Sequence, residues 1–182
     1  MNAEEILDRF FLSYMPGKDS VGKLRDIRLE RMNEILEVLG NPERNLTLVH
    51  VAGSKGKGSM SSILAKLLEG KGCKTGLFLS PHVFSLFERF TLSSSFFSDE
   101  EYLYVLNRLE KDLDKLSFRP STFELYTAYA YLLFSMTGCT HAVIETGLGG
   151  RLDATNTIDP WFSVIMPIEL EHTKYSEIRW RK

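Results

Sequence analysis

A glycine-rich loop stands between an apolar run and a helical pattern in the first half of the chain. The run Leu46–Ala52 reads LTLVHVA, which is typical of a buried strand, and Ser59–Glu69 has the spacing of a helix. Between them lies GSKGKG, with three glycines and two lysines. Glycine lets the backbone turn tightly and lets a ligand approach without a Cβ clash. A strand, such a loop and a helix in succession favour an α/β fold.

The rest of the sequence continues this alternation of strands and helices. Short apolar runs predict three more strands, and apolar residues at helical spacing predict four more helices. The alternation predicts a mostly parallel sheet with flanking helices, in one α/β domain of 182 residues. The predicted strands are Lys74–Leu79, His141–Glu145 and Phe162–Met166, and the predicted helices are Ala3–Leu12, Leu24–Leu39, Glu100–Leu116 and Thr122–Met136.

Composition excludes several classes of protein. The net charge is −2, so no basic field favours bulk nucleic-acid binding. No stretch approaches the ~20 apolar residues of a membrane span, and the acidic start MNAEEILDRFF does not resemble a signal peptide. Cys73 and Cys139 match no disulfide framework or metal motif, which fits a reducing compartment. We therefore expect a cytoplasmic protein that binds neither nucleic acid nor membranes.

The glycine-rich loop predicts a phosphate site. A strand-to-helix turn aims backbone N–H groups at one point, and the helix N-terminus adds partial positive charge there. Lys57 can reach the β- and γ-phosphates of a nucleotide, and Ser59 can cap the helix or lie near a phosphate-bound Mg²⁺. The spacing is shorter than G-x-x-x-x-G-K-[ST], and a flexible surface loop is the alternative interpretation. The candidate nucleotide-binding residues are Gly53, Ser54, Lys55, Gly56, Lys57, Gly58 and Ser59.

Three polar residues that follow later strands are candidates for a metal site. Glu145 ends an apolar strand ahead of a second glycine cluster, Ser80 follows the predicted strand before it, and His172 follows the last strand. Ligands of open α/β sheets bind beyond the carboxyl ends of the strands, where a carboxylate suits Mg²⁺ shared with a phosphate. Glu145 and Ser80 also have ordinary explanations, a strand-end acid that caps a turn and a Ser-Pro turn, and the alternative for His172 is that it has no metal role. His50, on a buried strand, is interpreted as structural.

The segments HVAGSKGKGS, LSPH, FERF, STFELYTAYAYLLF and ETGLGGRLDATNTIDP occur in this order between about Leu24 and Thr173. Together they resemble the folylpolyglutamate synthase/dihydrofolate synthase family of the Mur ligase superfamily. The resemblance implies a P-loop-type nucleotide-binding domain that uses ATP and Mg²⁺. It also implies ligation of L-glutamate to a carboxylate of dihydropteroate or of a folate, through an acyl phosphate, by an enzyme that is monomeric at full length.

The same resemblance implies roles for individual residues. The loop from Gly53 to Ser59 holds the triphosphate, and Lys57 neutralises its charge. Phosphoryl transfer of this kind needs positioning and charge neutralisation rather than a protein nucleophile. The implied catalytic residues are Lys57, Glu145 and His172, and the implied Mg²⁺ ligands are Ser80, Glu145 and His172. Segments that line the pterin side and the surface between loops contain Arg89 and Asp153.

The resemblance weakens toward the end of the sequence. The family pattern G-L-D-H-T-x-x-L-G corresponds to ELEHTKYSE from Glu169 to Glu177, and the final IRWRK matches nothing in the family. We therefore expect residues 1–182 to form a partial, apparently truncated ATP-binding domain without the family's C-terminal domain, and to be unable to ligate glutamate alone. The alternative function is a truncated or frameshifted non-catalytic fragment that retains at most weak nucleotide binding.

Overall fold

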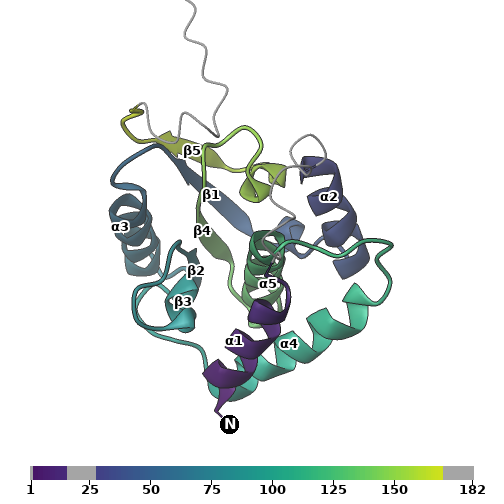
Figure 1. Ribbon diagram of the computed structural model, residues 1–182. Helices are drawn as coiled ribbons and strands as arrows, with labels where there is room; N and C mark the ends of the chain where they lie inside the picture. The colour runs from purple at the N-terminus through teal and green to yellow at the C-terminus, as the bar shows by residue number, and fades with distance from the viewer. Residues whose placement is uncertain (1, 16–27, 170–182) are drawn as a thin grey trace, which may run out of the picture.

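The computed structural model describes residues 2–15 and 28–169 of the chain. Its centre is a five-stranded sheet in the order β3-β2-β4-β1-β5 (Figure 1). All neighbouring strands are parallel except β3, which pairs antiparallel with β2 at one edge. The strands are β1 (Thr47–Ala52), β2 (Thr75–Phe78), β3 (Phe90–Leu92), β4 (His141–Glu145) and β5 (Phe162–Ile165).

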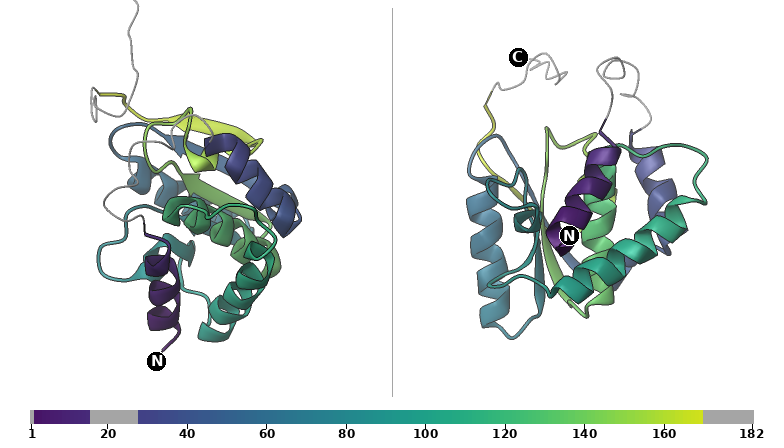
Figure 2. Two further views of the ribbon diagram at one scale, coloured as in Figure 1. Left: turned by 45° about the vertical axis from the view of Figure 1, so that its right-hand side comes forward. Right: turned by 60° about the horizontal axis from the view of Figure 1, so that its bottom comes forward.

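Helices cover both faces of this sheet. The helix α3 packs on one face, while α1, α2, α4 and α5 gather on the other face (Figures 1 and 2). The helices are α1 (Ala3–Ser13), α2 (Arg28–Leu39), α3 (Lys57–Gly70), α4 (Asp99–Leu113) and α5 (Thr122–Met136), with short 3₁₀ turns at η1 (Pro42–Asn45), η2 (Leu86–Arg89) and η3 (Ala154–Thr157).

The strands β1 and β4 are buried because helices cover both of their faces. Four consecutive residues of β1, Leu48 to Val51, are buried, and so are the last four residues of β4. Continuous apolar runs are typical of parallel strands between two helical layers. The pairing of Val51 with Glu145 brings the carboxyl ends of β1 and β4 to the same edge of the sheet. The loops that follow these strands are therefore neighbours.

The helix α5 forms the centre of the larger core. Its residues from Glu124 to Phe134 are all buried, because α1, α2 and α4 surround it on the side away from the sheet. Aromatic contacts join it to its neighbours: the ring centroids of Phe11 and Tyr126 lie 4.6 Å apart, and those of Phe90 and Tyr129 lie 5.0 Å apart. A helix that is apolar on all sides is expected to be buried in this way.

The predicted mostly parallel α/β sheet is confirmed, with differences at several element boundaries. The helix α3 begins at Lys57, two residues before the predicted start, and α4 ends at Leu113 rather than Leu116. The strand β3 was not predicted, because three residues are too few to show a period. Residues 24–27 of a predicted helix lie outside the described residues. No helix within the described ranges has the length and apolar character needed to cross a bilayer.

Candidate functional site

The glycine-rich loop connects the carboxyl end of β1 to the start of α3. Gly53 and Gly56 have φ angles of +135° and +76°, which L side chains rarely adopt. Gly56 is the N-cap of α3, and its carbonyl oxygen accepts the N–H of Met60 at 3.0 Å. Ser59 is the third residue of α3 and is exposed, so of the two roles predicted for its hydroxyl the capping role is wrong, and the place near a phosphate-bound Mg²⁺ stays a prediction. Because Gly56 is in the left-handed conformation and acts as the N-cap, the helix begins at Lys57, two residues before the predicted start at Ser59.

The N-terminus of α3 differs from those of three other helices. In each of those three, a side chain accepts a first-turn N–H and a glutamate returns the contact as a capping box. Within residues 2–15 and 28–169, no side chain caps α3. Among these residues its first-turn N–H groups therefore have no side-chain acceptor, which is the arrangement that binds an anion. The capping pairs of the other helices are Asn2 with Glu5, Ser98 with Glu101, and Ser121 with Glu124.

Glu145 and Ser80 meet beside this helix start. Glu145 ends β4 and is 5% exposed, and its Oε2 accepts the backbone N–H of Ser80 at 2.9 Å. The neighbouring strand β2 ends two residues before Ser80. The peptide bond between Ser80 and Pro81 is cis. A Cβ atom built on Gly58 would lie 3.6 Å from Glu145 Oε2 and 3.8 Å from Oε1. The carboxylate therefore lies against the first turn of α3.

The burial of the Glu145 carboxylate is only partly compensated by the groups around it. Burial raises the pKa of its carboxyl, and the Ser80 N–H and the positive charges of Lys57 and Arg89 oppose that rise only in part. Arg89 is itself fixed in place, because its Nε donates to His82 Nδ1 at 2.7 Å and its guanidinium lies 4.5 Å from the centre of the Tyr126 ring. A buried carboxylate of this kind is stabilised by a further cation.

The residues at this point fit a magnesium ion. The Ser80 hydroxyl oxygen is buried and has no hydrogen-bond partner among the residues that the structure describes. The backbone N–H of the same residue donates to the Glu145 carboxylate. Hydroxyl and carboxylate oxygens are the ligands that Mg²⁺ prefers. Among the residues of the described ranges, no group of three or more His, Cys, Asp or Glu side chains is arranged to hold a metal. His172 lies outside those ranges, and its predicted role as a ligand stays a prediction.

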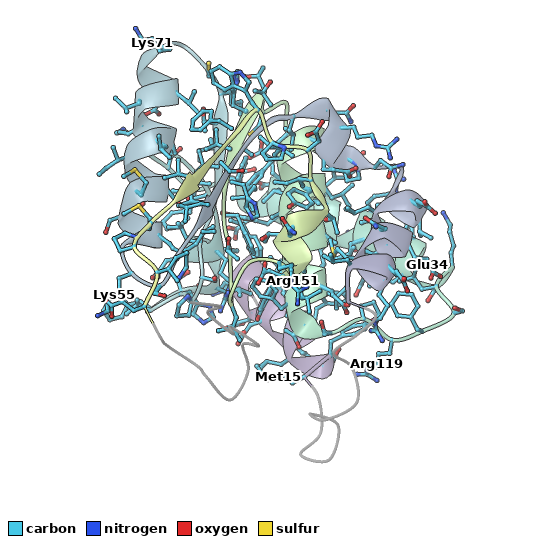
Figure 3. All side chains as sticks on the ribbon, turned by 90° about the horizontal axis from the view of Figure 1, so that it is seen from above. Met15, Glu34, Lys55, Lys71, Arg119 and Arg151 are labelled. Atoms are coloured by element: carbon cyan, nitrogen blue, oxygen red, sulfur yellow. The ribbon has the colours of Figure 1, made fainter. Side chains whose placement is uncertain are left out.

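The chain that follows β5 lies across the glycine-rich loop. The N–H of Ser54 donates to the carbonyl oxygen of Pro167 at 3.0 Å, and the N–H of Glu169 donates to the Ser54 hydroxyl at 2.9 Å. The Lys55 ammonium forms an ion pair with Glu169 Oε2 at 2.5 Å. Figure 3 shows Lys55 at the end of α3 that lies opposite Lys71. Lys55, a candidate nucleotide-binding residue, thus has a carboxylate partner in this structure.

Replacing Glu169 with glutamine is expected to strengthen Mg·ATP binding by about two- to fivefold at low salt, because it releases the Lys55 ammonium from an exposed ion pair. Isothermal titration calorimetry of the wild type and Glu169→Gln measures the change. The same substitution in a Lys55→Ala background is the control and should have no effect. An equal gain in both backgrounds would exclude Lys55 as the group released.

The structure also shows contacts of Asp153, Thr146 and Thr155 that the sequence analysis did not predict. Asp153 is 5% exposed and turned inward, and its Oδ2 accepts the N–H of Leu148 at 2.9 Å. Thr146 and Thr155 are fully buried beside His50. No sequence signal marked the two threonines beyond their places on either side of the glycines at positions 147, 149 and 150. The interpretation of His50 as a buried residue of a strand agrees with its 6% exposure.

The parallel sheet and the glycine-rich loop before an uncapped helix define an α/β nucleotide-binding domain of the P-loop type. No family model matches the chain. The chain is 37% identical to the dihydrofolate synthase/folylpolyglutamate synthase of Bacillus subtilis over 149 residues. The match covers 79% of this chain and 35% of that protein.

Solved structures show the same similarity. The crystal structure of folylpolyglutamate synthase from Thermotoga maritima has a TM-score of 0.79 and 33% identity, over 92% of this chain and 38% of that chain. A folylpolyglutamate synthase complex with AMPPCP and folate has a TM-score of 0.84 and 33% identity, over 96% of this chain and 42% of that chain. The chain belongs to the folylpolyglutamate synthase/dihydrofolate synthase family, as the sequence motifs predicted. It spans 35% of the length of the Bacillus subtilis relative.

Proposed function

We propose that this chain supplies the ATP-binding part of a ligase that joins L-glutamate to a carboxylate of dihydropteroate or of a folate. The observation that carries the proposal is the uncapped N-terminus of α3, which faces the buried carboxylate of Glu145. A family relative is described as a complex with AMPPCP and folate, which supports both a nucleotide and a folate as ligands. We further propose that residues 1–182 belong to the family's ATP-binding domain.

The chemistry that we propose has two steps. An oxygen of the acceptor carboxylate forms a bond to the γ-phosphorus of ATP while the bond from phosphorus to the bridging oxygen breaks, and ADP leaves. The amine of L-glutamate then forms the amide bond to the acyl carbon and loses a proton to solvent, while the bond from that carbon to the phosphate oxygen breaks and inorganic phosphate leaves. Neither step needs a protein nucleophile, so the contribution of the chain is to position the phosphates and to offset their charge.

Each predicted site residue has a part in this arrangement. The N–H groups of the loop from Gly53 to Ser59 would bind phosphate oxygens, except the Ser54 N–H, which donates to the Pro167 carbonyl oxygen in this structure. Lys57, on the first turn of α3, offsets the negative charge of the phosphates. Ser80 and Glu145 would hold Mg²⁺, which when bound neutralises charge on the phosphates. The Ser80 N–H keeps Glu145 turned toward α3. His172 is assigned as a third ligand and as a catalytic residue by family resemblance alone.

Replacing Lys57 with alanine is expected to weaken Mg·ATP binding by about 10- to 100-fold, because a charge-assisted contact to phosphate is worth ~1.5–3 kcal/mol. Calorimetric titration of the purified chain with Mg·ATP measures the loss. Lys71→Ala is the matched control, since Lys71 lies at the opposite end of α3 (Figure 3) and should leave the affinity unchanged. Equal affinities for the wild type and Lys57→Ala would exclude Lys57 from the site.

The proposed ligation and the non-catalytic alternative are separated by a second measurement. The chain is incubated with ATP, Mg²⁺, labelled L-glutamate and either dihydropteroate or tetrahydrofolate. A glutamylated product would assign the whole reaction to this chain, whereas Mg·ATP binding without product would assign it the nucleotide-binding part alone. A cytoplasmic location, a monomeric state and the absence of nucleic-acid or membrane partners stay predictions.

A further inference from the structure

A buried polar network links β1 to the loop that follows β4. The ring atom Nε2 of His50 lies 2.8 Å from the hydroxyl oxygen of Thr155 and 3.3 Å from that of Thr146. His50 is 6% exposed, and both threonines are fully buried. A buried polar side chain is kept only where its hydrogen bonds are satisfied. The two threonines come from opposite ends of one loop, so His50 contacts that loop at two points.

The hydrogen bonds of the two threonines fix the protonation of His50. The Thr146 hydroxyl donates to the carbonyl oxygen of Val51 at 2.9 Å, and the Thr155 hydroxyl donates to Asp153 Oδ1 at 2.6 Å. A hydroxyl carries one proton, so both oxygens face His50 only as acceptors. Nε2 must therefore carry the hydrogen and donate it to both oxygens. Burial also lowers the pKa of His50, against the opposing charge of Asp153, and this favours the neutral ring with Nδ1 unprotonated.

Asp153 closes the same loop upon itself. Its Oδ2 accepts the N–H of Leu148 at 2.9 Å, and its Oδ1 accepts the N–H of Thr155 at 3.0 Å in addition to the Thr155 hydroxyl. One carboxylate thus holds Leu148, near the start of the loop that follows β4, and Thr155, near its end. Among the described residues, the hydrogen bonds that attach residues 146–155 of this loop to the sheet are those of His50 and the bonds from Thr146 to Val51.

We propose that His50 is a positioning residue for the nucleotide and metal site, which as an Nε2-protonated imidazole ties the loop after Glu145 to the strand that carries the phosphate loop. The chain order supports this role. Thr146 directly follows Glu145. Gly53 lies three residues after His50 and is the first residue beyond the end of β1. Register pairs Val51 with Glu145, so His50 acts where the two loops leave the sheet. The functional part of the proposal rests on the proposed function above.

The protonation of His50 is tested first, without any nucleotide. Two-bond ¹H–¹⁵N spectra of the full chain should show Nε2 protonated and Nδ1 unprotonated, and hydrogen exchange should show protected amides at Leu148 and Thr155. A ring protonated on Nδ1 alone, or rapid exchange at both amides, would overturn the proposal. This measurement stands even if the wild type fails to bind Mg·ATP, so failure of the proposed function is recognised separately.

The positioning role is tested with paired variants. His50→Leu removes the donor, whereas His50→Gln keeps an N–H at a similar reach. Thr155→Val removes the accepting hydroxyl, and Thr155→Ser keeps it, which provides a second pair if the histidine variants do not fold. We expect about a tenfold loss of Mg·ATP affinity and faster exchange at Leu148 in the variants without the polar group, and recovery to within about threefold in the conservative ones. Wild-type affinity and protection in a folded His50→Leu or Thr155→Val would overturn the positioning role.

Discussion

Replacing Gly53 with alanine is expected to abolish detectable Mg·ATP binding and to lower the free energy of unfolding by more than ~3 kcal/mol. The φ angle of +135° is strained for any L side chain. The added Cβ would also lie 2.6 Å from Met166 Cβ and 2.8 Å from the Met166 carbonyl oxygen. Since the second contact is with backbone, relief requires the phosphate loop or the chain after β5 to move.

Two other glycines separate the contributions of strain and clash in this prediction. Gly72 has a φ of +85° and open space around its Cβ position, so Gly72→Ala should cost about 1 kcal/mol from backbone strain alone. Gly70 ends α3 with an ordinary φ and open space, and Gly70→Ala should be neutral or stabilising by up to ~1 kcal/mol. Urea unfolding and Mg·ATP titration of the three variants provide the comparison. Equal stability of Gly53→Ala and Gly72→Ala would contradict the close contact with Met166.

The features of the fold that the sequence predicted are those set by local patterns. Continuous apolar runs identified β1 and β4, because strands buried on both faces need no polar side. The helix α5 was predicted with its observed bounds from its apolar residues, and the structure shows a capping box of Ser121 and Glu124 at its start. The strand β3 was missed because it is held by pairing with β2 rather than by a pattern of its own.

The features of the site that the sequence did not predict depend on contacts between distant segments. The rule that ligands bind at the carboxyl ends of strands correctly brought Ser80 and Glu145 to one edge of the sheet. It could not show that Glu169 pairs with Lys55, because the two residues are far apart in the chain and either could face solvent. The inward turn of Asp153 likewise depends on the amides that it accepts.

Replacing Glu145 with glutamine is expected to raise the free energy of unfolding at neutral pH by ~0.5–2 kcal/mol. Residues of functional sites often lower the stability of a protein, so that their replacement stabilises it by this amount. Burial raises the folded-state pKa of the Glu145 carboxyl, so the unfolded chain releases this proton first as the pH rises. The wild type therefore loses stability as the pH rises from the unfolded pKa through the folded pKa. The gain from glutamine should be full above that window and should vanish below it.

Glu69→Gln is the control of opposite sign for this pH dependence. Hydrogen bonds from Lys66, Ser94 and Ser93 lower the pKa of the exposed Glu69 carboxyl to about 2. The stability that this carboxylate contributes is present above the unfolded pKa and is lost as the pH falls toward the folded pKa. Glutamine at position 69 should therefore destabilise the chain at neutral pH, and urea unfolding between pH 3 and pH 8 compares both variants. A loss of stability in Glu145→Gln at neutral pH would show that the carboxylate is better compensated than its burial indicates.

The same Glu145→Gln substitution is expected to weaken binding of ATP in the presence of Mg²⁺ by about 10- to 100-fold, since an amide replaces the charged ligand. Binding of ATP in the presence of EDTA should change little or improve, because the amide removes a negative charge beside the first turn of α3. Titrations of the wild type and the variant with ATP in Mg²⁺ and in EDTA give four affinities. If the ratio of the affinities in Mg²⁺ and in EDTA is the same for both proteins, Glu145 does not hold the metal, and its retention as a buried carboxylate requires another cause.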